Sequence, residues 1–108
     1  MPKNNNEMAK LAESADEAAE SLKAIANPLR LQILCHLAGG ECTVHELESR
    51  LQVSQSNVSQ QLAKLRDRGI VSCRREGRNL FYSLQDMRYL EIIAAIKNAF
   101  CPSFPRGR

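Results

Sequence analysis

The spacing of apolar residues between Ser54 and Gly69 predicts an amphipathic helix. Val58, Leu62 and Leu65 recur at i, i+4 and i+7, which places their side chains on one face of a helix. Ser54 is a favourable N-cap, and Gly69 suits the left-handed residue that ends many helices. Both boundaries of the helix are therefore marked in the sequence.

The opposite face of this helix carries short hydrogen-bonding side chains and almost no acid. An ordinary surface helix favours Glu and Lys, because Ser and Asn are poor helix formers. A helix in the DNA major groove uses such polar groups at its N-terminal turns to reach base edges and phosphates. We therefore predict DNA contacts from Ser54, Gln55, Ser56, Asn57, Ser59, Gln60 and Lys64.

A long helix with a narrow apolar stripe is predicted near the N-terminus. The stripe follows a spacing of three and four residues through Met8, Leu11, Ala15, Ala18 or Ala19, Leu22 and Ile25. A narrow stripe of this kind packs on another helix, of the same chain or of a partner. Residues 1–7 show no periodicity, and we expect a disordered N-terminus there.

A second helix is predicted between Pro28 and Ala38. Asn27 is a suitable N-cap, proline is favoured at the first helical position, and two glycines follow the helix. Apolar residues lie on two of its sides, with Leu31, Cys35 and Ala38 forming the second stripe. A helix with two apolar sides is expected to lie between two layers.

A third helix is predicted from about Val44 to Leu51. Thr43 and Glu46 have the spacing of a capping box, which marks its start. Only a short turn separates this helix from the one that begins after Ser54. Two short helices joined by a tight turn, the second with a polar outer face, predict a helix-turn-helix.

The residues after Gly69 predict a β-hairpin. Ile70–Arg75 and Leu80–Leu84 are rich in β-favouring residues and flank the loop Glu76–Asn79. Three arginines, Arg74, Arg75 and Arg78, lie near the tip. The hairpin is either an ordinary solvated one or, as we predict, a wing whose arginines reach the DNA backbone or minor groove.

Asp86 is a suitable N-cap for a last helix, from Met87 to about Phe100, which ends at Cys101. Residues 102–108 are rich in Pro and Gly, and we expect a flexible tail. The predicted fold is mainly α with a β-hairpin wing. Its order is α-α-α-α-β-β-α, a winged helix-turn-helix domain over residues 8–101.

Composition narrows the class of protein. A chain of 108 residues with 44% hydrophobic residues forms one globular domain. No signal peptide and no long apolar run is present, so we expect a cytoplasmic protein without membrane contact. The net charge is only +3, but residues 64–78 hold six basic residues against two acidic ones. Phosphate affinity follows such local cation density.

The sequence offers nothing typical of an enzyme. It contains no phosphate-binding glycine loop, no carboxylate pair in a cleft-forming context and no convergent Ser/His/Asp set. We therefore predict no catalytic residues and no cofactor. A protein-interaction module that kept the fold but lost DNA binding is the remaining alternative to a DNA-binding regulator.

The order of elements and the residues themselves resemble the ArsR/SmtB family of winged-helix regulators, from about Ala18 to Cys101. The matching segments are LKAIANPLRLQILCHL, TVHELESRLQVSQSNVSQQLAKLRDRGIVSCRREGRNLFYSL and the last helix. The resemblance implies a homodimer joined through the first and last helices. It also implies a repressor that binds double-stranded DNA, at a pseudo-palindromic operator, until an inducer binds.

Cys35 and Cys101 resemble the cysteine pair of the BigR, HlyU, YgaV and SqrR subgroup. That resemblance implies sensing of oxidants or reactive sulfur species, with DNA affinity lowered by a disulfide or a sulfur-lengthened bridge. We expect Cys101 to react first, because it ends a helix beside the tail, and Cys35 to resolve the intermediate. A constitutive regulator without an inducer is an alternative.

A metal-responsive regulator is the other alternative. Thr43 and His45 stand where metal-sensing family members carry a CVC motif, and the last helix contains no His. Cys42 and His45 could supply two ligands but need one or two more, so we predict no metal site. We expect Cys42 to be an exposed bystander, Cys73 to face the core, and His36 and His45 to face solvent.

Overall fold

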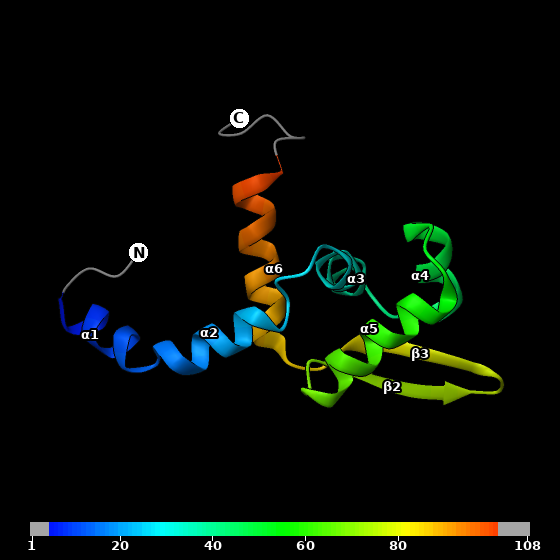
Figure 1. Ribbon diagram of the computed structural model, residues 1–108, viewed down its shortest axis with the longest axis horizontal. Helices are drawn as coiled ribbons and strands as arrows, with labels where there is room; N and C mark the ends of the chain where they lie inside the picture. Colours follow the sequence, from blue (N-terminus) through cyan, green and yellow to red (C-terminus); the bar gives the residue numbers. More distant parts are fainter. Residues whose placement is uncertain (1–4, 102–108) are drawn as a thin grey trace.

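The computed structural model describes residues 5–101 and contains six helices and a three-stranded antiparallel sheet in that range (Figure 1). The elements are α1 (Asn5–Glu13), α2 (Ala15–Lys23), α3 (Pro28–Ala38), β1 (Cys42–Thr43), α4 (Val44–Leu51), α5 (Gln55–Asp67), β2 (Val71–Glu76), β3 (Asn79–Leu84) and α6 (Met87–Phe100). The predicted winged helix-turn-helix is confirmed. The expected tail at 102–108 lies outside the described residues, as do the first four residues.

The prediction of one continuous N-terminal helix is wrong. Two helices, α1 and α2, meet at Ser14, whose backbone leaves the helical region at φ −94° and ψ 10°. The Ser14 N–H donates to the Leu11 carbonyl at 3.0 Å, which closes a tight turn. The first helix also begins at Asn5, inside the stretch expected to be disordered. A periodic stripe does not reveal such a break, because both helices continue the same spacing.

The core lies between α3, α4, α5 and the sheet. Val58, Leu62 and Leu65 are completely buried, as their spacing predicts. They pack with the buried stripe of α3, which is Ile33, Leu34 and Leu37. Burying side chains of this size stabilises the fold by about 1.5–3 kcal/mol each. This packing fixes which side of α5 faces outward.

The second apolar side of α3 is covered only in part. Leu31 and Ala38 are half-buried, whereas Cys35, which belongs to the same stripe, is exposed. Within one chain α6 is the terminal helix that packs against α3. The prediction that α3 lies between two complete layers is therefore correct for one side and incomplete for the other.

The sheet contains a strand that the sequence pattern did not predict. β1 pairs with β3, with Cys42 opposite Tyr82, and gives the strand order β1-β3-β2. The hairpin pairs Glu76 with Asn79, so its loop is only Gly77 and Arg78, shorter than expected. Gly77 has a φ of +63°, which glycine adopts without the steric cost that a side chain brings.

The last helix joins the domain at its base. Asp86 caps α6 by accepting a hydrogen bond from the Arg88 N–H at 3.1 Å, as predicted. The Tyr89 hydroxyl donates to the Ser21 carbonyl at 3.0 Å and links α6 to α2. Figure 1 shows α1 and the far end of α6 projecting from the body of the domain. Among residues 5–101, none of the helices has the length and apolar character needed to span a bilayer.

We predict that Asn27→Ala lowers the free energy of unfolding by about 1 kcal/mol. The Asn27 side chain accepts hydrogen bonds from the Leu29 and Arg30 N–H groups, both at 3.0 Å, at the start of α3. Ser14→Ala is the matched control, because Ser14 is an N-cap whose side chain makes no capping bond. Urea denaturation at one protein concentration checks the difference. Equal losses in the two variants would contradict the prediction.

Candidate DNA-binding surface

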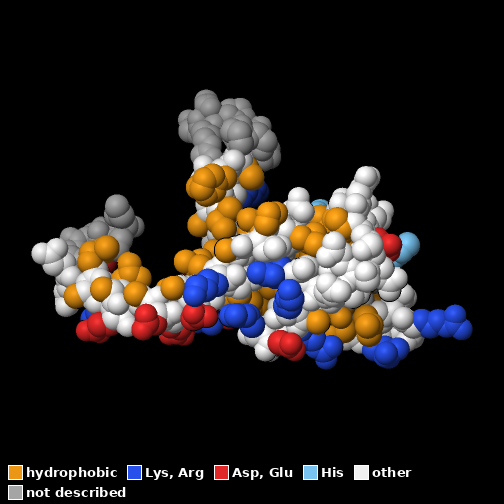
Figure 2. All heavy atoms as spheres, viewed as in Figure 1, with side chains coloured by type: hydrophobic (Ala, Val, Ile, Leu, Met, Phe, Trp, Pro, Cys, Tyr) orange, Lys and Arg blue, Asp and Glu red, His pale blue; other side chains and the backbone are white. Residues whose placement is uncertain are grey.

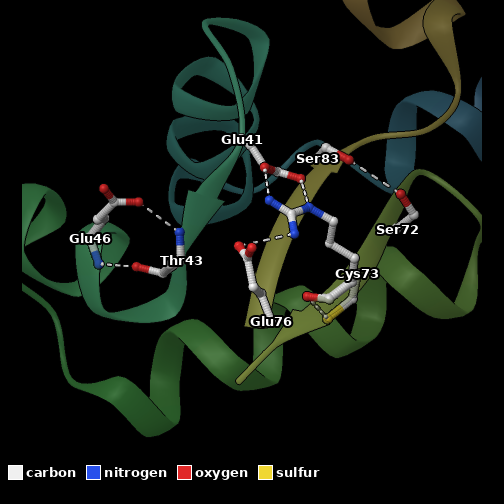
Figure 3. Close-up of polar contacts among 8 residues, drawn as sticks. Glu41, Thr43, Glu46, Ser72, Cys73, Glu76 and Ser83 are labelled. Atoms are coloured by element: carbon white, nitrogen blue, oxygen red, sulfur yellow. Dashed lines mark hydrogen bonds and ion pairs between the residues drawn. The ribbon is translucent and has the colours of Figure 1, made fainter. Parts of the chain in front are cut away.

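The turn between α4 and α5 sets the geometry of the helix-turn-helix. The start of α4 is held by the predicted capping box, in which Thr43 Oγ1 accepts from the Glu46 N–H at 3.0 Å and Glu46 Oε1 accepts from the Thr43 N–H at 2.8 Å (Figure 3). Gln52 then takes a left-handed conformation, with φ +57°. Ser54 Oγ accepts from the Asn57 N–H at 3.2 Å and begins α5 as predicted.

The residues predicted to contact DNA from α5 lie together on its outer side. Six of the seven predicted residues are exposed, and Ser59 is half-buried. The exposed ones are Ser54, Gln55, Ser56, Asn57, Gln60 and Lys64. The only carboxylate on α5 is Asp67, in its last turn. The N-terminal turns of α5 therefore present amides and hydroxyls without negative charge.

The three hairpin arginines differ in their surroundings. Arg75 and Arg78 are exposed and form no ion pair within the described part of the chain. Arg74 instead donates from Nε and Nη2 to the two carboxylate oxygens of Glu41, at 2.8 and 2.9 Å (Figure 3). Its Nη1 also donates to Glu76 at 3.3 Å. The structure therefore separates one anchored arginine from two that extend into solvent.

The Arg74–Glu41 pair crosses the whole sheet. Arg74 is opposite Phe81 in the β2–β3 register, and its guanidinium lies 4.5 Å from the centre of that ring. Glu41 immediately precedes β1 on the far side of β3. Hydrogen bonding from Arg74 lowers the pKa of Glu41, and the same contact raises the pKa of Arg74. Glu41 was not identified from the sequence, because the β1–β3 pairing that positions it was not predicted.

Charge is unevenly distributed over the surface. In Figure 2, acidic side chains gather along α1 and α2, and Lys and Arg gather over the middle of the molecule and along the hairpin to its tip. This agrees with the acid-rich N-terminal segment and with the basic residues at 64–78. A basic face that includes α5 and the hairpin attracts phosphate.

Cys35 and Cys101 lie within range of an electrostatic interaction with each other. All four cysteines lie among the described residues as thiols, and these two are exposed. Burial raises the pKa of Cys35, and the charge of Cys101 raises it further. The second effect requires the two sulfur groups to interact across the α3–α6 packing.

The expectation for Cys42 is wrong, whereas Cys73 agrees with its prediction. Cys42 is only 1% exposed, because β1 pairing turns its side chain into the core. Arg50 Nη1 lies 3.3 Å from its Sγ, yet burial is the larger effect and raises the pKa of Cys42. Cys73 is half-buried and packs against the core.

The two histidines differ in exposure. His45 is exposed, with Nδ1 3.8 Å from Glu48, and His36 is half-buried. Within residues 5–101, no three His, Cys, Asp or Glu side chains are grouped in a way that could hold a metal ion.

A helix-turn-helix followed by a basic hairpin defines the class of winged-helix DNA-binding proteins. Residues 27–72 match the family model described as the bacterial regulatory protein, arsR family. A biofilm growth-associated repressor of Agrobacterium fabrum is 45% identical over 87 residues, which cover 81% of this chain and 74% of that protein. The transcriptional regulator YgaV of Escherichia coli is 41% identical over 97 residues, covering 89% of this chain and 98% of the regulator.

A solved structure supports the same assignment. The repressor BigR from Xylella fastidiosa superposes with a TM-score of 0.84 at 35% identity, covering 89% of this chain and 98% of that one. The chain belongs to the ArsR family and, within it, to the BigR/HlyU subgroup. It is a DNA-binding transcriptional regulator and not an enzyme, as the sequence predicted.

We predict that the stabilising effect of the Glu41–Arg74 pair depends on pH. The ionised Glu41 carboxylate favours the folded state, because its pKa is lowered from 4.5 by Arg74. The difference in free energy of unfolding between the parent and Glu41→Gln should be complete above pH 4.5. It should vanish as the pH falls through the lowered pKa.

Urea denaturation across this pH range measures the difference. Glu13→Gln is the control, because Glu13 is exposed and forms no ion pair with any described residue. A Glu41→Gln effect that persists unchanged in acid would contradict the prediction.

Proposed function

We propose that this regulator is a homodimer that binds a pseudo-palindromic operator as a repressor and releases it when Cys35 and Cys101 are bridged. The observation that carries the DNA-binding half is the acid-free polar surface at the start of α5, beside a basic hairpin. Two such helices about one DNA turn apart would read two half-sites. The name of the Agrobacterium relative calls that protein a repressor, which supports the direction of regulation.

Exposed apolar surface supports the dimer. Met8, Leu11 and Leu22 on α1 and α2 are about half exposed, and Phe100 at the end of α6 is 77% exposed. A hollow of about 400 Å³ lies between α2 and α6, with Leu22 and Ile92 in its lining. Exposed apolar surface beside an apolar hollow is typical of protein–protein contacts. The proposed interface joins α1, α2 and α6 of the two chains.

The proposed DNA contacts are of two kinds: contacts that recognise base edges and contacts that hold the protein on the DNA backbone. Gln55, Asn57 and Gln60 can donate and accept hydrogen bonds at base edges, and the hydroxyls of Ser54, Ser56 and Ser59 suit base edges or phosphates. Arg75 and Arg78 would reach the backbone or the minor groove from the wing. Arg74 was predicted with them, but Glu41 and Glu76 occupy its guanidinium. Its proposed part is to hold the wing at a fixed angle.

The proposed switch begins at Cys101, because the thiolate is the reacting form and the raised pKa of Cys35 reduces its share of thiolate at neutral pH. Attack of Cys101 on a polysulfide transfers one sulfane sulfur and leaves the polysulfide one sulfur shorter. Attack of the Cys35 thiolate on the Cys101 sulfur then releases hydrosulfide and forms the disulfide. Two thiols are oxidised by two electrons, and the transferred sulfur is reduced.

A lengthened bridge forms when Cys35 and Cys101 have each become a persulfide, with one added sulfur apiece. The persulfide of Cys35 attacks the Cys101 sulfur and releases hydrosulfide, which leaves three sulfurs between the two β-carbons. With peroxide as oxidant, Cys101 would instead form a sulfenic acid, and Cys35 would displace water from it. Each route closes a loop of roughly 66 residues, worth up to ~4 kcal/mol in the chain-entropy model.

The bridge would act on DNA through helix packing. Cys35 lies on α3, which packs against α4 and α5, and Cys101 ends α6, which belongs to the proposed dimer interface. A covalent tie between α3 and α6 would change the angle between each DNA-reading unit and the dimer. Because the duplex fixes the distance between half-sites, a small rotation would remove contacts on both sides.

We predict that Gln60→Ala combined with Lys64→Ala weakens operator binding by roughly 5- to 150-fold, the equivalent of one good base contact. Fluorescence anisotropy with a duplex from the upstream region of its own gene measures the affinity. The control is Lys10→Ala combined with Gln85→Ala, which changes an exposed residue after β3 and one on the polar side of α1, away from Met8 and Leu11. Unchanged affinity in the α5 variant would contradict the proposed reading surface.

We predict that Cys35→Ser and Cys101→Ser each abolish the loss of DNA binding caused by polysulfide, peroxide and diamide. Mass spectrometry beside DNA-binding measurements identifies the bridge and its number of sulfurs. Cys73→Ser is the control and should respond as the parent does. Release of DNA by the two serine variants, or by Zn²⁺ while oxidants have no effect, would contradict the switch and favour the metal-responsive alternative.

A further inference from the structure

A basic hollow lies at the end of α5 that is away from the helix-turn-helix turn. It has a volume of about 350 Å³ and is formed by the end of α2, the start of α3 and the last turns of α5. Its lining contains Lys23, Arg30, Lys64 and Arg68 with a single carboxylate, Asp67. Figure 2 shows Lys and Arg side chains gathered in the middle of the viewed face, where α2 and α5 end.

Arg30 is held in place at this hollow without a carboxylate partner. Its Nε donates to the Ala24 carbonyl at 2.7 Å, and its Nη1 donates to Gln61 Oε1 at 3.0 Å. These bonds use two of the five N–H donors and leave three without an acceptor among the described residues. A half-buried guanidinium that is already oriented loses little entropy when an anion binds, and its planar donors match phosphate.

The hollow and the wing lie on opposite flanks of α5. Gln61, Lys64 and Arg68 recur at i, i+3 and i+7, so they share one flank, and the Arg30–Gln61 bond shows that this flank faces α3. α5 also packs against β2, and in Figure 1 the hairpin lies on the opposite side of α5 from α3 and the end of α2. A helix in the major groove has a phosphate backbone on each side. With α5 in the groove, the wing would lie toward one DNA backbone and the hollow toward the other.

Two carboxylates reduce the positive charge of the hollow but do not cancel it. Glu20 pairs with Lys23 at 3.2 Å, and Asp67 is part of the lining. Lys64 has no ion-pair partner among the described residues, and Arg68 is bound only to the Glu20 carbonyl, at 3.4 Å. Arg30, Lys64 and Arg68 therefore have no carboxylate in contact with them among the described residues.

We propose that this hollow binds a backbone phosphate of the DNA, on the side of the major groove away from the wing. Arg30, Lys64 and Arg68 would donate to the phosphate oxygens, and Lys23 would contribute at the rim. The lining contains no aromatic side chain on which a base could stack, which favours a backbone phosphate over a free nucleotide. The inference rests on the proposed placement of α5 in the groove.

The test uses the full chain and compares a variant that loses a positive charge with a variant that loses a negative charge. Affinity for the operator duplex and for an unrelated duplex of equal length is measured by anisotropy over a series of KCl concentrations. Arg68→Gln should reduce the slope of log affinity against log salt by about 0.9, the value for one lost phosphate contact. Both duplexes should weaken by the same factor, because a phosphate contact carries no sequence information.

Asp67→Asn should have the opposite effect and tighten binding to both duplexes, because it removes a negative charge beside the phosphate. Lys10→Gln and Asp16→Asn make the same charge changes on the polar sides of α1 and α2, away from the apolar residues of the proposed dimer interface, and should leave the slope unchanged. Arg30→Gln should resemble Arg68→Gln, with its melting temperature measured beside it because Arg30 also links α2, α3 and α5.

The proposal is overturned if Arg68→Gln and Asp67→Asn bind DNA with the affinity and salt slope of the parent. It is also overturned if the two variants change affinity in the same direction. Failure of the groove placement has a different signature, in which Gln60→Ala, a change outside the hollow, weakens binding to the operator no more than binding to the unrelated duplex. The two results are therefore distinguishable in one set of measurements.

Discussion

The packing of α5 against α3 is the constraint on which the DNA-binding surface depends. Val58, Leu62 and Leu65 have no exposed area, so α5 cannot rotate about its axis without opening the core. The side turned outward is fixed by this burial, and the bond between Arg30 and Gln61 adds a polar link between the same helices. A rigid reading surface therefore follows from apolar contacts on the far side of the helix, where no DNA is present.

The elements with strong local signals could be predicted from the sequence, and those that depend on pairing could not. Ser54, the Thr43–Glu46 capping box and Asp86 each cap a helix through neighbours in the sequence, and all three do so in the structure. The strand at Cys42–Thr43 has two residues and exists only because β3 lies beside it. Gln52 adopts a left-handed conformation that is typical of Gly or Asn. The residue type therefore did not predict this conformation.

The missed strand also explains the errors at the candidate site. Without β1, Cys42 was expected at the surface, and the partner that occupies Arg74 was not considered. The four cysteines are sorted by burial and not by their sequence neighbours. Arg50 beside Cys42 favours a thiolate, but burial outweighs it, while Cys35 and Cys101 remain accessible. Cys35 and Cys101 are thus accessible to solvent, Cys73 is half-buried, and only Cys42 among the four is fully buried.

The Glu41–Arg74 pair has a consequence for how the domain would leave DNA. Glu41 follows α3 after only two glycines, so the ion pair fastens the wing to the end of the helix that carries Cys35. The wing, α3 and α5 are therefore linked by the core on one side and by the ion pair on the other. In the proposed complex, the wing would therefore have no separate hinge, and it would leave the duplex together with the reading helix.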